Sequence, residues 1–142
     1  MDAYYIVNDT NDPIAVKATE IRKQEYLFWR EVKPDLEDDF DISCHTLSAR
    51  TGLSERRTRD ITMALYRLAE LPLTKALQET YYFLDFSRLI TIDAVLSKLG
   101  DIPTEILERI DQELARYLTP TKPGQVPVSY THLRAHETVL DL

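Results

Sequence analysis

The spacing of hydrophobic residues predicts a long amphipathic helix near the start of the chain. Apolar residues follow Pro13 at helical intervals: Ile14, Ala18, Ile21, Phe28 and Val32. This period matches one face of an α-helix. Glu25 interrupts the stripe, and Pro34 ends the helix. We expect about five helical turns here, with the apolar stripe directed toward the core.

Two shorter helices are predicted on either side of a glycine turn. The segment from Ser43 favours a brief helix that ends at Gly52. Ser54 favours the start of the next helix, because its hydroxyl can accept a hydrogen bond from a backbone N–H of the first turn. One face of that second helix carries the residues expected to be buried: Thr58, Ile61, Leu65 and Leu68. The carboxylate-rich residues 35–41 before this pair favour a solvated loop.

Three further helices are predicted in the second half of the chain. The first begins at Pro72, and the second ends at Gly100, which suits a left-handed cap. The third begins at Pro103 and stops at Pro120. The second is expected to bury Leu89, Ile92, Leu96 and Leu99, and the third aligns Ile106, Ile110, Leu114 and Tyr117 on one face. No segment shows the alternation of a strand, so the fold is predicted to be all-α, a bundle of about five to six helices.

Length and composition suit one globular domain. Residues 1–118 are expected to form the helical domain, residues 119–127 a linker rich in proline, and residues 128–142 a flexible tail. With only 3 glycines, none clustered, a Rossmann or P-loop protein is excluded. The single cysteine, Cys44, indicates a reducing, cytoplasmic setting. Neither a secretory signal nor a membrane-spanning run is found.

The charge distribution concentrates positive residues in one stretch. The whole chain has a net charge of −7, whereas residues 47–67 carry 5 arginines against 2 acidic residues. Within this stretch, "LSARTGLSERRTRDITMALYRL" resembles a helix-turn-helix at about residues 45–70. Gly52 supplies the turn, and Leu53 is expected to fill the space between the helices. Such motifs contact DNA near the start of the second helix.

Four arginines are therefore the candidate DNA-binding residues: Arg50, Arg56, Arg57 and Arg59. Contact with phosphates is favoured over base recognition, because at least half of protein–DNA hydrogen bonds go to the backbone. Thr58 departs from the motif, which usually has Val or Ile there. Because a helix-turn-helix is also a common way to pack two helices, scaffolding is an equally weighted interpretation.

The order of pieces in residues 14–127 resembles the domain of unknown function 222, found in actinobacterial proteins that often carry an HNH endonuclease module. The long first helix, "LSARTGLSERRTRDI", "LAELP" and the closing "IPTEILERIDQELARYL" carry the resemblance. It implies a non-catalytic N-terminal region that positions DNA or the nuclease. It implies no catalytic or metal-binding residue and no cofactor in this chain, and a divalent metal only in the nuclease module. Alternatives are a DNA-binding regulator and a protein-interaction module.

Residues 128–142 are interpreted as having a different origin from the rest of the chain. The codons of Val128–Thr138 can spell a transposon-end adapter of sequencing library kits, which makes the tail an artefact of assembly. His132 and His136 then reflect a nucleotide sequence rather than a metal site. The remaining histidine, His45, lies beside Cys44, and a surface or packing role is favoured over a catalytic dyad.

Two other clusters favour structural roles. Three carboxylates of the last helix are expected on a solvated face opposite the apolar stripe: Glu105, Glu108 and Asp111. Four aromatic residues are expected in the core rather than as a base-stacking platform, which would need basic neighbours: Tyr81, Tyr82, Phe83 and Phe86.

Overall fold

The computed structural model describes residues 4–6, 11–37, 39–119 and 125–127. Its six helices are α1 (Pro13–Val32), α2 (Phe40–Thr51), α3 (Glu55–Ala69), α4 (Pro72–Tyr81), α5 (Phe86–Ser97) and α6 (Thr104–Leu118). Two three-residue strands, β1 (Tyr4–Ile6) and β2 (Gln125–Pro127), pair antiparallel. The predicted all-α bundle is confirmed. The two strands did not show in the sequence, because three residues are too few for an alternating pattern.

The helix ends follow local chemistry. The Asp12 carboxylate accepts hydrogen bonds from the backbone of Ile14 and Ala15 at the start of α1, and Ser54 accepts one from Arg57 at the start of α3. Gly100, with φ of 69°, adopts the left-handed conformation expected of it. Helix α2 begins at Phe40, earlier than predicted, because the carboxylate-rich stretch also supplies its first turn.

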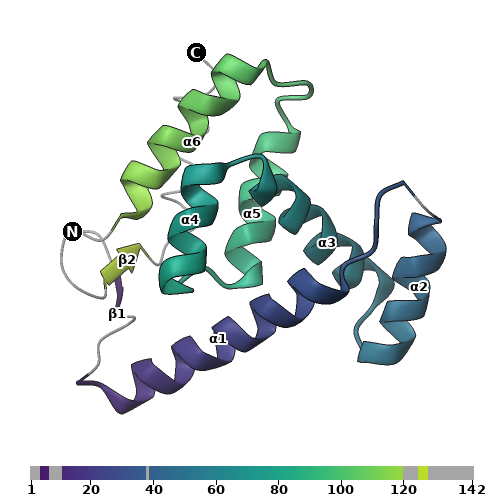
Figure 1. Ribbon diagram of the computed structural model, residues 1–142, viewed down its shortest axis with the longest axis horizontal. Helices are drawn as coiled ribbons and strands as arrows, with labels where there is room; N and C mark the ends of the chain where they lie inside the picture. The colour runs from purple at the N-terminus through teal and green to yellow at the C-terminus, as the bar shows by residue number, and fades with distance from the viewer. Residues whose placement is uncertain (1–3, 7–10, 38, 120–124, 128–142) are drawn as a thin grey trace.

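Helix α3 lies at the centre of the fold. It contacts α1, α2, α4 and α5, while α6 packs against α4 (Figure 1). The largest fully buried apolar side chains come from α3, the α3–α4 connection, the α4–α5 connection, α5 and α6: Ile61, Leu71, Phe83, Leu89, Leu96 and Ile110. Helix α2 lies at the far side of the molecule from α6, beside the end of α1 (Figure 1). The core is therefore built around α3, and α2 lies at its margin.

Helix α1 buries a different face from the one its apolar stripe predicted. Ile21 is 67% exposed and Phe28 46% exposed, whereas Tyr26 and Trp29 are buried. The Tyr26 hydroxyl donates to Glu79 of α4, and its ring stacks on Phe86. Aromatic side chains bury more area than aliphatic ones and add ring contacts, so the aromatic face is the one that packs.

The connection between α4 and α5 is closed by a buried amide. Gln78 donates from Nε2 to the carbonyl of Leu84 at 3.0 Å and accepts from its backbone N–H at 2.9 Å. Tyr82, with φ of 54°, ends α4 in the left-handed region. Of the aromatic cluster, Phe83 and Phe86 are buried as expected, while Tyr81 is 39% exposed. The core role therefore holds for only part of that cluster.

The predicted linker and tail fall partly or wholly outside the described residues. Thr119 ends α6, and Gln125–Pro127 pairs with β1, so this part of the linker is ordered as a strand. Residues 128–142, with both tail histidines, lie outside the described part of the chain.

Candidate nucleic-acid interface

The connection between α2 and α3 has the local geometry of a tight turn. Gly52 ends α2 with φ of 79°, a conformation that favours glycine. The Ser48 hydroxyl donates to the Leu53 carbonyl at 2.5 Å, which fastens the turn to α2. Leu53 is itself 38% exposed, so it does not fill the space between the helices as predicted. The turn is held by hydrogen bonds rather than by that side chain.

The residue that departs from the motif fits the structure. Thr58 is fully buried, and its hydroxyl donates to the carbonyl of Ser54 one turn earlier at 3.0 Å. A buried hydroxyl with a partner avoids the cost of an unsatisfied polar group. Thr62 repeats this arrangement with the carbonyl of Thr58 at 2.8 Å. Threonine is therefore compatible with the buried face of α3.

The four candidate arginines fall into two groups. Arg59 donates to Asp41 of α2 at 2.6 Å and lies over the ring of Phe40. That hydrogen bond raises the pKa of Arg59 above its usual value. Arg59 therefore joins α3 to the start of α2, which is a scaffolding contact.

The other three arginines are less engaged. Arg56 is 88% exposed and meets Asp60 only at 3.7 Å. Arg57 is half-buried in the first turn of α3, and Arg50 is exposed in the last turn of α2. In the described part of the chain, the guanidinium groups of Arg50 and Arg57 lie within 4.0 Å of no carboxylate. These groups are available to an external anion.

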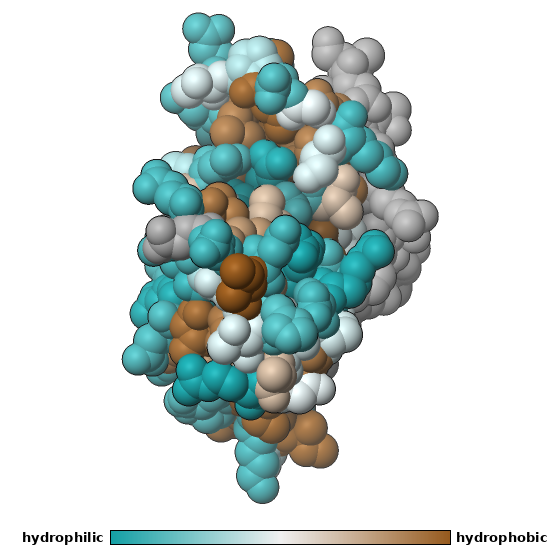
Figure 2. Space-filling view, turned by 90° about the vertical axis from the view of Figure 1, so that its right-hand side faces the viewer, coloured by the Kyte–Doolittle hydropathy of each residue, from teal (hydrophilic) through white to brown (hydrophobic). Residues whose placement is uncertain are grey.

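Carboxylates limit the strength of this positive surface. Glu55 accepts from His45 at 2.5 Å, and Asp60 and Asp41 lie beside arginines as described. The side of the molecule that includes α2 is mostly hydrophilic, with separate hydrophobic patches (Figure 2). Exposed charge pairs are screened by salt and contribute little each. The arrangement suits weak phosphate contacts more than a strongly positive groove.

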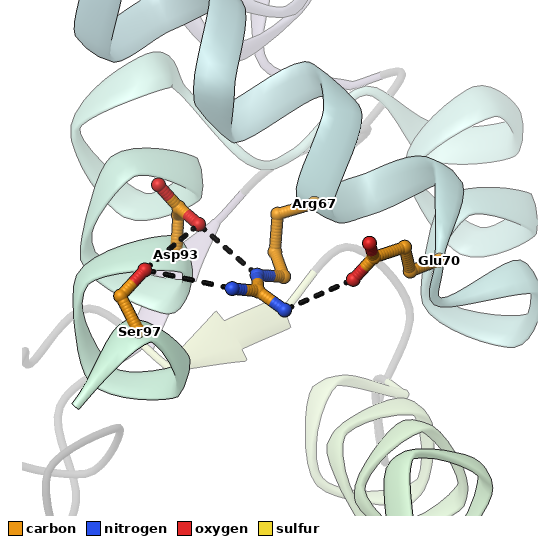
Figure 3. A network of polar contacts seen from close by, with 4 residues as sticks. All are labelled: Arg67, Glu70, Asp93 and Ser97. Carbon is orange, nitrogen blue, oxygen red and sulfur yellow. Dashed lines mark hydrogen bonds and ion pairs between the residues drawn. The ribbon is translucent and has the colours of Figure 1, made fainter. Parts of the chain in front are cut away.

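Arg67, the last arginine of the basic stretch, is structural. Its Nε donates to Asp93 of α5 at 3.0 Å, and its Nη1 donates to Glu70 at 2.9 Å (Figure 3). Ser97 lies 3.5 Å from its Nη2. Arg67 and Asp93 are each only 18% exposed, so this network ties α3 to α5.

Cys44 and His45 do not form a dyad. Cys44 is fully buried, and burial raises the pKa of its thiol, which disfavours the reactive thiolate. His45 is exposed and directed to Glu55 of α3. Cys44 is therefore a packing residue and His45 a surface residue.

The expected solvated carboxylate face was wrong at Asp111, although Glu105 and Glu108 are exposed. Asp111 is 3% exposed and accepts from the backbone N–H groups of Leu73 and Thr74 at 2.8 and 2.9 Å. The Thr74 hydroxyl donates to it as well, at 2.8 Å. Asp111 of α6 therefore caps α4. The signal in the sequence was that α4 begins at Pro72 without a capping side chain of its own.

An apolar groove lies between the end of α1 and α2. Its volume is about 520 Å³. Phe28 and Val32 line one side, Ile42 and Leu47 the other, and Arg50 lies among the lining residues. Sequence reasoning missed this groove because it assigned the α1 stripe to the core.

Comparisons with known proteins yield no relative. No family model matches the chain, and neither a curated protein nor a solved structure is significantly similar to it. Among the described residues, no three His, Cys, Asp or Glu side chains gather as a metal-binding group. No helix in that part of the chain has the length and apolarity needed to cross a membrane.

Proposed function

We propose that this chain is a non-catalytic helical region that contacts DNA weakly, with α2 and α3 acting as a helix-turn-helix. The observation that carries the proposal is the set of available guanidinium groups on both sides of the Gly52 turn, from Arg50, Arg56 and Arg57. In the wider proposal, which rests on the sequence resemblance alone, the region positions DNA or an HNH nuclease module.

Phosphate contact is the mode of binding that suits these residues. The long arginine side chains can reach a DNA phosphate. The carboxylates beside them repel DNA that comes close enough for its base edges to be read. Phosphate contacts orient a protein on DNA without selecting a sequence. We expect affinity near the non-specific range, with Kd of about 10⁻⁴ to 10⁻⁶ M. Arg59 is left out of the binding set because it is held by Asp41.

The salt dependence of DNA binding tests this assignment. Three phosphate contacts give a log–log slope of about −2.7, using roughly −0.9 for each contact. In the variant Arg56→Ala/Arg57→Ala, the slope should fall to about −0.9, because one contact remains. The matched control is Arg109→Ala/Arg116→Ala, which removes two exposed arginines from α6. Fluorescence anisotropy with a labelled duplex measures both.

The two variants carry the same change in net charge, so they separate local contact from general attraction. An equal effect of both pairs would contradict the proposed interface. Preference for one duplex over a shuffled one by more than about tenfold would instead support the regulator. Metal-dependent nicking of a plasmid by the pure chain, abolished by chelation, would contradict the non-catalytic assignment.

A further inference from the structure

One apolar face of α1 is largely exposed in the described part of the chain, although Val32 at its end packs partly against the core. Its stripe follows the a and d positions of a heptad repeat over the whole helix of 20 residues: Ile14, Ala18, Ile21, Glu25, Phe28 and Val32. Ile14 is 79% exposed, Ile21 67% and Phe28 46%. We call these six positions the α1 seam. The neighbouring face, with Ala15, Tyr26 and Trp29, is the one buried in the core.

The charged residues beside the α1 seam are placed so that they can pair with the same residues of a second copy of the chain. On the flank away from the core, the heptad places Lys17, Gln24 and Glu31 at successive equivalent positions. Lys17 and Glu31 are exposed, and neither forms an ion pair or hydrogen bond in the described part of the chain. One end of this flank is therefore positive and the other negative.

We infer that the α1 seam is the interface of an antiparallel homodimer. Antiparallel pairing brings Lys17 of each copy opposite Glu31 of the second copy, and the two Gln24 amides opposite each other. Parallel pairing would instead bring Lys17 toward the positive Arg22. Charges flanking a coiled-coil seam set the orientation of the helices, so the antiparallel arrangement is selected.

The groove between α1 and α2 extends this interface. Phe28 and Val32 are both seam residues and groove-lining residues. In the antiparallel arrangement, Ala18 and Ile14 of the second copy lie opposite these two residues. The exposed Ile42 of α2, at 63%, adds apolar surface on the other side. Each copy thus inserts the first half of its α1 beside the groove of the other, which is an isologous two-fold contact.

Glu25 limits the affinity. It is exposed in the structure, and in the dimer it lies opposite Ile21 of the second copy. A charged group at a seam position specifies register and weakens association, because its desolvation is costly. The dimer is therefore expected to be reversible, with the monomer folded by its own core.

A charge-swap series tests the dimer and its orientation by sedimentation equilibrium. Lys17→Glu should weaken association of the full chain by about tenfold, because two exposed attractive pairs become repulsive. Glu31→Lys should do the same, and the double variant should restore wild-type association. Because neither side chain holds the monomer together, the helical signal of all three should remain unchanged. A wild type that stays monomeric up to a concentration of about 1 mM would overturn the inference. Failure of the double variant to restore association would do so too.

A second set of variants tests the seam itself. Ile21→Lys should abolish association, whereas the control Val16→Lys, an exposed apolar position on the other side of α1, should not. Glu25→Leu should tighten association by about tenfold or more through added apolar burial. Adding Ile21→Lys to that variant should reverse the gain. Equal effects of Ile21→Lys and Val16→Lys, or persistence of the gain in the combined variant, would contradict the seam.

Discussion

The two ends of α3 carry arginines in contrasting settings. Arg67 at the C-terminal end is 18% exposed and has partners on α3 and α5, whereas Arg59 near the N-terminal end is 41% exposed and has one close carboxylate partner, on α2. The C-terminal end of α3 belongs to the packed part of the fold with α4, α5 and α6. The N-terminal end lies at the margin of the fold beside α2, where arginines remain available to an external anion. A charged residue in a basic stretch can therefore serve the core or the surface, depending on what packs over it.

The largest effect on stability is expected in the packed part of the fold, at Asp111 of α6. Replacing Asp111 by Ala should lower the free energy of unfolding by about 2–4 kcal/mol, because the buried N–H of Thr74 and the partly buried N–H of Leu73 lose a charged acceptor. Denaturation by urea, followed by circular dichroism, measures the loss. Glu108→Ala, at an exposed position of the same helix, is the control and should change stability by less than about 0.5 kcal/mol. Equal effects of the two would show that Asp111 does not cap α4.

Loss of the Arg67 side chain should lower stability by less than loss of the Asp111 side chain. In Arg67→Ala, the free energy of unfolding should fall by about 1–3 kcal/mol, because the poorly exposed Asp93 loses its cation. The double variant Arg67→Ala/Asp93→Ala should recover part of this loss, since no unpaired charge remains. A double-mutant cycle without coupling between these positions would remove the contrast between the two ends of α3.

The contact between α1 and α4 should make stability depend on pH. Burial raises the pKa of Glu79, but hydrogen bonds from Arg30 and Tyr26 outweigh it and hold the pKa below its usual 4.5. A lowered pKa in the folded state stabilises the fold above pH 4.5, and this contribution is lost as the pH falls through the folded-state value. Glu79→Gln should flatten the pH dependence of unfolding over that range. An unchanged pH profile would contradict this.

Arg59 should give the smallest effect on stability. Its bond to Asp41 is an exposed ion pair, so Arg59→Ala should lower the free energy of unfolding by about 0.2–1 kcal/mol. The slope of DNA binding against salt should stay near the wild-type value, because Arg59 is already occupied. If Arg59→Ala flattens the salt dependence of DNA binding as much as Arg56→Ala/Arg57→Ala does, Arg59 contacts DNA. Its role in joining α2 to α3 would then be contradicted.

Much of the fold could be predicted from periodicity and local capping. The helices, the Gly52 turn, the Ser54 cap and the buried Ile61 follow from interactions within a few residues of one another. The early start of α2 was missed because carboxylates are as compatible with a first helical turn as with a loop. The sequence could not predict that the candidate arginines have different partners, with Arg59 held by Asp41 and Arg50 next to no carboxylate.

The sequence by itself determined where the helices form, because helix periodicity and caps are local properties. The tertiary structure decided which face of α1 is buried, since two apolar faces compete and only the aromatic one finds α4 and α5. It also decided that Asp111 is buried and Arg50 is not. Such choices depend on partners tens of residues away. No pattern within a single helix contains that information.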